Sequence, residues 1–306
     1  MKNKWDKLGR IFYKSPKGRH PMLLTHFSNP LAMHLNDDTF RIFYNGRDYK
    51  NRSSIGAVDI DIVNGKIIQE FDKPIFKFGP KNSFYRDGIS IGNFYKQKNS
   101  LYMLFMGWQA EKKMHWRGDI GRLKINSDLS LSIKSPFKPL LTYHDIDPIS
   151  LSYPFVMKVK NHYMMWYGST LNWDAGNGEM LHVINVAKSS DGNFWHRMGL
   201  SVPFKIGSAQ AFSRPTVIQD KDNKYEMWFS YRGKPGVPYR IGYASSDYGI
   251  KWDLDIENAG IAISRTGWDS KMIEYPYVFL HKKQTYMLYN GNDFGKTGIG
   301  LAIRKK

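Results

Sequence analysis

The sequence predicts an all-β protein, and three observations lead to that prediction. A two-part phrase occurs five times in the 306 residues: an apolar run holding a proline or glycine, then a short polar turn and an aromatic run. The phrase returns at a nearly constant spacing. A third apolar run follows each copy. Strand-length runs separated by turn residues at a fixed period are typical of a repeat fold of antiparallel strands.

The first run of each copy contains the anchor of the repeat. These runs span residues 28–35, 85–94, 151–159, 212–218 and 273–280. Four of them carry a proline, and Gly88 is assigned to the same place in the other. The anchors Pro30, Gly88, Pro154, Pro215 and Pro276 are separated by 88 − 30 = 58, 154 − 88 = 66, 215 − 154 = 61 and 276 − 215 = 61 residues. A period of about 61 residues, taken five times, accounts for the whole chain.

The second and third runs complete the repeating unit. The second runs span residues 40–48, 101–109, 163–170, 225–233 and 286–293, and the third runs span 55–60, 120–125, 181–192, 240–249 and 298–304. In two units a turn containing Asp and Gly leads to Trp195 or Trp252, which predicts a hairpin into a fourth strand. Four strands per unit around a closed ring predict a five-bladed β-propeller with four-stranded antiparallel blades.

The two ends of the chain fit this ring. Residues 4–13 have strand character, whereas the last unit ends after its third strand. We therefore expect the N-terminal strand to supply the missing outer strand and close the ring. The repeat also predicts that residues 1–306 form a single domain.

The proline anchors indicate where a site lies. Proline has no N–H and is tolerated in sheets at edges or strand starts, so the first run is predicted to be the innermost strand, facing the central channel. The residues just before each anchor are then expected at the channel mouth. They are Asn29, Arg86, Asp87, Ser152, Tyr153, Arg214, Glu274 and Tyr275.

Composition excludes several classes of protein. There is no cysteine, so neither a disulfide framework nor a thiolate metal site is expected. The nine histidines show no metal-site spacing, and no metal ligand is predicted, although a calcium or sodium ion in the channel stays open. The N-terminus lacks an apolar core of signal-peptide length and no stretch approaches a membrane span, which predicts a cytoplasmic protein.

The formal net charge of +18 bears on partners. It suits nucleic acid, an anionic membrane surface to which the protein binds peripherally, or a negatively charged small substrate. Nucleic acid is disfavoured because helix-turn-helix, zinc-finger and RNA-binding signatures are missing. Arginines recur at inner-strand and mouth positions, and the rigid guanidinium fork matches phosphate.

Particular phrases resemble a known superfamily. Residues 214–217 (RPTV), residues 227–232 (MWFSYR) and the Ser-Ser-Asp turns near residues 189–192 and 245–249 resemble the five-bladed propeller glycoside hydrolases. That group includes arabinanases, xylosidases, invertases, levansucrases and mannoside phosphorylases. The resemblance implies a carbohydrate-active enzyme.

The resemblance also implies where carboxylates should lie. Invertase-like members have a nucleophilic Asp before the first proline, an Arg-Asp pair on the second blade and an acid-base Glu on the third, and glycoside hydrolysis uses two such groups. Arg86 and Asp87 match the second blade. Asn29 stands at the first position and Ser152-Tyr153 at the third, so neither of these is a carboxylic acid.

Three explanations for this departure stay open. The catalytic carboxylates have moved, with Glu274, Asp48, Asp119 and Glu179 as candidates, or one carboxylate acts with inorganic phosphate as co-substrate, or the site only binds. Glu274 directly precedes Tyr275-Pro276 on an inner strand, where an unpaired carboxylate is costly to bury.

The sequence therefore predicts an enzyme that cleaves or transfers a glycosyl unit on an anionic or phosphate-bearing sugar, with no further cofactor. Asp87 and Glu274 are the predicted catalytic residues, and Arg86 and Arg214 are predicted to bind the anion. The other predicted substrate-binding residues are Asn29, Tyr153, Asp48, Arg47, Arg117, Asp119, His182, Arg232, Trp108 and Trp268. Two alternatives remain, a glycosyltransferase of surface-polysaccharide biosynthesis and a non-catalytic glycan-binding propeller.

Overall fold

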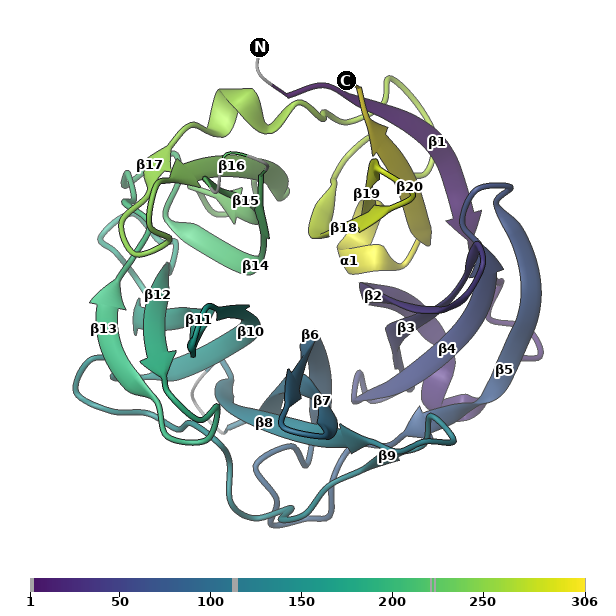
Figure 1. Ribbon diagram of the computed structural model, residues 1–306, viewed down its shortest axis with the longest axis horizontal. Helices are drawn as coiled ribbons and strands as arrows, with labels where there is room; N and C mark the ends of the chain where they lie inside the picture. The colour runs from purple at the N-terminus through teal and green to yellow at the C-terminus, as the bar shows by residue number, and fades with distance from the viewer. Residues whose placement is uncertain (1–2, 112–114, 221, 223, 306) are drawn as a thin grey trace.

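The computed structural model describes residues 3–111, 115–220, 222 and 224–305. Nearly all of its regular structure is β-strand, in agreement with the all-β prediction. The strands pair in three sheets, which are arranged in a ring (Figure 1). Among the described residues no helix is both long and apolar enough to cross a membrane.

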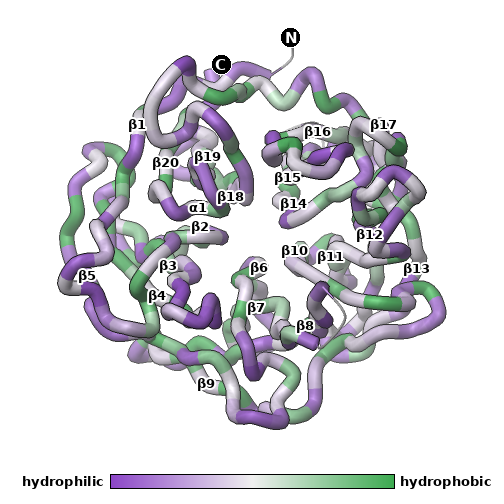
Figure 2. Tube along the Cα trace, turned by 180° about the vertical axis from the view of Figure 1, so that it is seen from behind, coloured by the Kyte–Doolittle hydropathy of each residue, from purple (hydrophilic) through white to green (hydrophobic). Residues whose placement is uncertain are grey.

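The first sheet contains eight strands. They are β2 (Thr25–Asn36), β3 (Thr39–Arg47), β4 (Ser53–Asp61), β5 (Lys66–Phe76), β6 (Gly88–Gln97), β7 (Ser100–Gln109), β8 (Arg117–Ile125) and β9 (Leu131–Ser132). Consecutive strands pair antiparallel within β2–β5 and within β6–β9. A single parallel pair, Ser53 with Gly88, links the two groups. The outer strand β5 is mostly exposed and mixes hydrophilic and hydrophobic residues (Figure 2).

The second sheet repeats this arrangement. Its strands are β10 (Ser150–Val159), β11 (His162–Asn172), β12 (Leu181–Ser189), β13 (His196–Leu200), β14 (Ala211–Gln219), β15 (Tyr225–Arg232), β16 (Arg240–Ser246) and β17 (Asp253–Leu254). In the strand pairing of the described residues, the parallel pair of His182 with Ala211 joins β10–β13 to β14–β17. The hairpins predicted ahead of Trp195 and Trp252 are confirmed, because β13 and β17 begin at the next residue.

The third sheet joins the two ends of the chain. It has the order β1 (Trp5–Phe12), β20 (Ile299–Arg304), β19 (Gln284–Asn290) and β18 (Glu274–His281). The N-terminal strand pairs antiparallel with the last strand, as the sequence predicted. Trp5 is buried and meets Trp228 edge to face, with ring centroids 5.5 Å apart. Three short helices lie in the connections: η1 (Pro21–Leu23), η2 (Ile256–Ala259) and α1 (Asn292–Gly295).

The inner strand of each group contains a break in its register. In β2, β10, β14 and β18 two residues lie opposite one on the neighbouring strand, which is a β-bulge. The bulged pairs are Asn29-Pro30, Tyr153-Pro154, Arg214-Pro215 and Tyr275-Pro276. The residue before each proline has a positive φ, of 55°, 40°, 48° and 53° in that order. Such values are uncommon outside glycine and persist where the surrounding structure imposes them.

The anchor that the sequence assigned to β6 is wrong. Gly88 is the first residue of β6, whereas the register break lies between Ile91 and Phe94, so Gly92-Asn93 takes the place of the proline pairs. The reason is close packing: a Cβ on Gly92 would lie 2.2 Å from the carbonyl oxygen of Pro154 on the adjoining inner strand. With Asn93 as the anchor the first two spacings become 93 − 30 = 63 and 154 − 93 = 61 residues.

Candidate functional site

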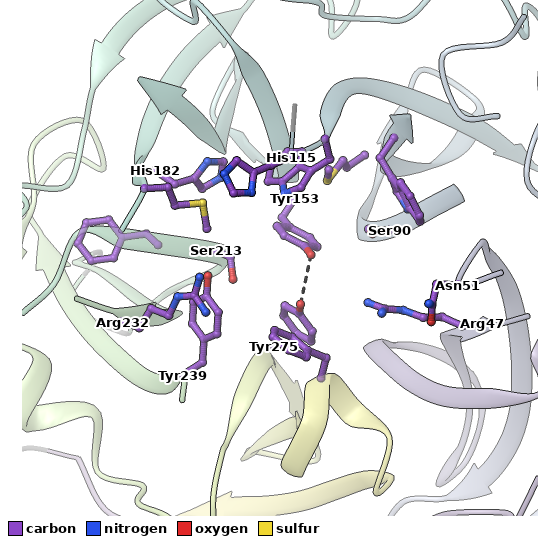
Figure 3. A pocket seen from close by; sticks show the side chains of 16 residues that line it. Arg47, Asn51, Ser90, His115, Tyr153, His182, Ser213, Arg232, Tyr239 and Tyr275 are labelled. Carbon is purple, nitrogen blue, oxygen red and sulfur yellow. Dashed lines mark hydrogen bonds between the residues drawn. The ribbon is translucent and has the colours of Figure 1, made fainter. Parts of the chain in front are cut away.

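A pocket of about 380 Å³ lies at the end of the ring where the inner strands begin (Figure 3). Its walls come from both halves of the chain. The polar and aromatic residues that line it include Arg47, Ser90, Trp108, His115, Trp116, Tyr153, His182, Ser213, Arg232, Tyr239, Tyr275 and Phe294. The predicted site residues brought together here are therefore Arg47, Trp108, Tyr153, His182 and Arg232.

Glu274 is buried and is not itself a lining residue, but it directly precedes Tyr275, which lines the pocket. It is the first residue of β18, its exposed fraction is zero, and neither carboxyl oxygen has a hydrogen-bond partner among the described residues. Burial raises the pKa of the Glu274 carboxyl well above its ordinary value, although Arg47 and Arg232 act in the opposite direction. The buried Glu274 carboxyl is therefore harder to ionise than an ordinary glutamate.

The repeat shows that the fold does not need a carboxyl at this place. The residue directly before the bulged pair is a serine in three other inner strands, namely Ser28, Ser152 and Ser213. An unpartnered buried carboxyl costs free energy that a serine would not. A titratable group kept at such a position, with a shifted pKa and beside a pocket, is typical of a functional site.

Three tyrosines connect Glu274 to the pocket. Tyr153, Tyr239 and Tyr275 all line it, and the charge of Glu274 would raise the pKa of each hydroxyl. The Tyr153 hydroxyl donates to the Tyr275 hydroxyl at 3.3 Å across the ring (Figure 3). Burial is the largest cause of the raised pKa of all three hydroxyls, so they are neutral hydrogen-bond donors.

The two pocket arginines differ in what they bind. Arg47 ends β3 and points into the cavity (Figure 3), and within the described part of the chain its guanidinium has no ion pair. Arg232 ends β15; its Nε lies 2.9 Å from Oε2 of Glu179, and its guanidinium lies 4.8 Å from the centre of the Tyr239 ring. Arg47 is thus the cation left to meet a ligand.

One wall of the pocket is polar but uncharged. His182, on β12, is bonded through Nδ1 to the Thr170 hydroxyl at 2.7 Å and through Nε2 to the Ser152 hydroxyl at 2.6 Å. Burial lowers the pKa of His182 to about 3, so the ring is neutral. The indole of Trp116 lies against it, with ring centroids 5.7 Å apart.

Asp87 and Arg86 do not line the pocket. They lie in the connection ahead of β6, where Arg86 Nε is 3.2 Å from Oδ2 of Asp87 and its terminal nitrogen is 3.1 Å from Glu111. Oδ2 of Asp87 also accepts the backbone N–H of Ala110. Both side chains are thus held in a partly exposed cluster outside the cavity.

Arg214 and Asn29 lie in the inner wall of the ring, behind the pocket lining. Arg214 donates to the carbonyl oxygens of Tyr275 at 2.8 Å and Pro30 at 2.7 Å, which ties three inner strands together. Burial lowers the pKa of Arg214 to about 9, and no carboxylate pairs with it in the described residues. The amide of Asn29 donates to the Asn45 side chain at 3.2 Å.

The other predicted residues are engaged elsewhere. Asp48 accepts the backbone N–H groups of Lys50 and Arg52 and stabilises the turn after β3. Asp119 and Arg117 lie near one another on β8 and are not part of the lining. Trp268 stacks on Tyr289 in the core, with ring centroids 5.4 Å apart.

Sequence reasoning did not single out Tyr239, Phe294 or Ser213. Tyr239 and Phe294 lie in connections that do not repeat, so no periodic signal marks them. Asp293 and Phe294 each have a φ of 57°. Neither residue is glycine, so the sequence gives no sign of this left-handed backbone conformation. Within the described residues, no group of three or more His, Asp or Glu side chains is placed to hold a metal ion.

Comparison with solved structures defines the class of fold. The chain matches a glycoside hydrolase with a TM-score of 0.76 at 14% identity, covering 98% of this chain and 91% of the other. It matches a thermostable family-43 glycoside hydrolase at 0.68 (14% identity; 95% and 92% covered). An α-L-arabinofuranosidase of Podospora anserina, solved with cellotriose, gives 0.69 (11% identity; 99% and 97% covered). The protein therefore has the fold of the propeller-type glycoside hydrolases.

Sequence comparison identifies the family. Two proteins of Mycobacterium tuberculosis, the uncharacterized protein Rv1502 of strain H37Rv and the uncharacterized protein MT1551 of strain CDC 1551, are each 38% identical over 301 residues. The match covers 98% of this chain and 98% of each relative. The chain belongs to the same family as these mycobacterial proteins. No family model matches the sequence.

Proposed function

We propose that this protein is a carbohydrate-active enzyme that breaks or transfers a glycosidic bond, with Glu274 as its general acid. The observation that carries the proposal is the buried carboxyl of Glu274, which has a raised pKa and no hydrogen-bond partner among the described residues and directly precedes the pocket-lining Tyr275. A protonated carboxylic acid is what the leaving oxygen of a glycoside requires, because that oxygen must gain a proton as the C–O bond breaks. The aromatic and polar lining suits a sugar ring.

The attacking group must come from outside the pocket lining. None of the described lining residues is an aspartate or glutamate; Glu274 adjoins the lining at Tyr275, and Glu179, which adjoins it at Arg232, is held in that ion pair. In the proposed reaction Glu274 gives its proton to the leaving oxygen, the glycosidic C–O bond breaks, and the anomeric carbon bonds to a second substrate. Water, inorganic phosphate and a sugar hydroxyl each fit that role, and the resulting Glu274 carboxylate regains a proton from solvent or from the attacking group.

The substrate carries an anionic group in this proposal. Arg86 and Arg214, the arginines first expected to bind it, are bound to protein groups outside the cavity. The support comes instead from Arg47, which points into the pocket without a carboxylate partner among the described residues. A phosphate or carboxylate group of the substrate would pair with the Arg47 guanidinium. The positive charge of the chain also suits an anionic membrane surface as the place where such a substrate is met.

The strand pairing supports a single five-bladed ring as the frame of this site. Each eight-stranded sheet divides at one parallel pair into two antiparallel groups of four, and β18, β19, β20 and β1 form a further group. Residues of all five groups line the pocket, for example on β3, β6, β10, β14 and β18.

Two other functions remain candidates. A glycosyltransferase would use the same acid and arginine, with a sugar hydroxyl as the attacking group and a phosphate-bearing donor. A non-catalytic glycan-binding protein is favoured by one observation, the lack of a second carboxylate in the described lining. The experiment below separates the binding protein from an enzyme.

The test compares Glu274→Gln with Asp87→Asn on a panel of nitrophenyl glycosides, oligosaccharides and sugar phosphates, with and without inorganic phosphate. Loss of a general acid is expected to slow turnover by about a hundredfold or more. Asp87→Asn is expected to retain most activity, because Asp87 lies outside the pocket. Full activity of a folded Glu274→Gln variant would refute the assignment, and ligand-induced stabilisation without turnover in the wild type would favour the binding protein.

A further inference from the structure

The connections between strands fall into two sets, one at each end of the ring. Successive antiparallel strands alternate in direction, so the connections that follow the second and fourth strands of each group lie at the same end. Arg47 ends β3 and Arg232 ends β15, and both line the pocket. This set of connections defines the mouth end; the turns after the first and third strands define the opposite end.

The lysines at the mouth end that have no ion pair within the described residues include the following seven. They are all exposed and come from six different connections around the ring: Lys50, Lys77, Lys81, Lys205, Lys234, Lys271 and Lys296. Several acids at this end are already bound to arginines, as in Glu179 with Arg232 and Asp48 with Arg52. The lysine charges therefore act together on whatever approaches the mouth.

Exposed apolar side chains stand beside these lysines. Tyr49, next to Lys50, is 74% exposed, and Ile206, next to Lys205, is 45% exposed. Val237, three residues after Lys234, is 43% exposed. Lysines interleaved with exposed apolar residues are typical of surfaces that rest on anionic lipid, where the ammonium groups meet headgroups and the apolar groups enter the interface.

The opposite end also has exposed apolar residues and lysines, among them Lys98, Lys160 and Lys283, but its turns carry carboxylates as well. Phe194 and Tyr248 are 84% and 79% exposed there. They lie in turns that contain Asp191 and Asp247, and carboxylates in the other turns of that end, including Asp128, add further negative charge. The carboxylates of these turns would repel an anionic surface. The two ends therefore differ in their charge and not in their exposed apolar residues.

We infer that the mouth end docks on an anionic lipid surface, so that the pocket opens toward the membrane. The separate positions of Tyr49, Ile206 and Val237 on three connections favour a planar lipid surface over a soluble polyanion, which would need charge alone. Resting on the proposed function, this orientation further assigns the substrate class: a sugar attached to a lipid through an anionic group, with Arg47 beside that group.

The test measures co-sedimentation with vesicles of phosphatidylcholine alone and of phosphatidylcholine mixed with phosphatidylglycerol. The mouth variant is Lys50→Gln with Lys205→Gln and Lys234→Gln. Its matched control removes the same charge at the opposite end, with Lys98→Gln, Lys160→Gln and Lys283→Gln. A third variant combines Tyr49→Ser, Ile206→Ser and Val237→Ser. All of these side chains are exposed, so the fold should be retained, which a thermal melt checks.

The wild type is expected to bind only the vesicles that contain phosphatidylglycerol, and more weakly as salt is raised. The mouth variant should bind about a hundredfold more weakly, at the usual contribution of each lysine near a charged membrane. The opposite-end control should bind within about threefold of wild type by the same reasoning, and the apolar variant should lose affinity for vesicles but not for dextran sulfate.

An equal loss of vesicle affinity in the mouth variant and the opposite-end variant would overturn the docking surface. Binding of the wild type to dextran sulfate but not to vesicles would also overturn it, and would indicate a soluble polyanionic glycan instead. The two proposals fail separately. Glu274→Gln should bind vesicles like wild type, so vesicle binding without turnover contradicts only the enzyme. Turnover of soluble glycosides without vesicle binding contradicts only the docking surface.

Discussion

At the scale of single residues, Glu274 and Arg47 share one property: the described structure gives neither side chain a carboxylate–cation partner, although they lie near one another beside the same cavity. Buried polar groups are normally satisfied by protein or water. Other arginines and acids near the mouth are paired, as Arg232 is with Glu179 and Asp87 with Arg86. A ligand that accepts a proton and carries negative charge would satisfy both at once.

Glu274 should make the protein less stable as pH rises, which is the reverse of the usual carboxylate. Its folded-state pKa is raised above the ordinary 4.5, so the native state holds a proton that the unfolded state releases. The contribution of this carboxyl to the free energy of unfolding is therefore fully present below about pH 4.5. It falls by up to about 1.4 kcal/mol per pH unit as the pH rises above that value, toward the folded-state pKa. Glu274→Gln removes this loss. We expect its melting temperature to exceed that of wild type by an amount that grows between pH 5 and pH 8. A constant difference would mean that Glu274 titrates normally.

Arg47 should determine whether anions bind. Arg47→Met keeps an unbranched apolar stem but removes the only pocket guanidinium that lacks an ion pair among the described residues. We expect it to weaken binding of inorganic phosphate at least about tenfold, because hydrogen bonds to charged groups contribute about 1.5–3 kcal/mol each. Calorimetry measures the affinity. Arg86→Met is the control, since Arg86 is held by Asp87 and Glu111; a larger effect there would move the anion site to the second group of strands.

At the scale of elements, the inner strands show what a repeat pattern can and cannot predict. The four prolines mark four register breaks because proline cannot donate to a neighbouring strand. The break in β6 carries Gly92-Asn93, which has no such chemical mark, and the phrase around Gly88 matched the expected Arg-Asp pair more closely. Only the packing of Gly92 against Pro154 on a strand far along the chain reveals the true position.

Gly92 should tolerate no side chain. A Cβ there would lie 2.2 Å from the backbone of Pro154, and a backbone atom cannot move aside as a side chain can. We expect Gly92→Ala to lower the free energy of unfolding by about 2–3 kcal/mol, in the range of overpacked cores. Urea denaturation measures the change. Asn99→Ala, in the exposed turn of the same hairpin, should change it by less than about 0.5 kcal/mol. Equal effects would indicate that β6 does not pack against β10 as described.

At the scale of the whole molecule, the N-terminal strand joins the ends of the chain. β1 pairs with β20, and Trp5 is buried against Trp228 of a neighbouring group of strands. Trp5→Ala should lower the free energy of unfolding by about 3–5 kcal/mol, as for other buried tryptophans. Leu8→Ala is a matched control on the same strand, because Leu8 is half exposed. Equal losses, measured by chemical denaturation, would contradict a closure that depends on Trp5.

The fold could be predicted more fully than the site, for a physical reason. Strand-length runs, turns and the closing N-terminal strand are local in sequence, and the period of the repeat orders them. The pocket is not local: Arg47, Tyr239 and Phe294 meet only because separate connections converge at the mouth. Glu274 could be singled out because it directly precedes Tyr275-Pro276 on an inner strand, where an unpaired carboxylate is costly to bury. Asp87 was favoured by resemblance to the second blade and lies outside the lining.

The most direct measurement is the titration of the Glu274 carboxyl itself, followed by ¹³C NMR in protein labelled on glutamate and assigned by difference from Glu274→Gln. It needs no substrate and reports the property on which the proposed acid depends. The account predicts a carboxyl still protonated at neutral pH, with a midpoint well above 4.5. A midpoint near 4.5 would mean that Glu274 is an ordinary carboxylate at neutral pH, and the proposal of a general acid in this pocket would be abandoned.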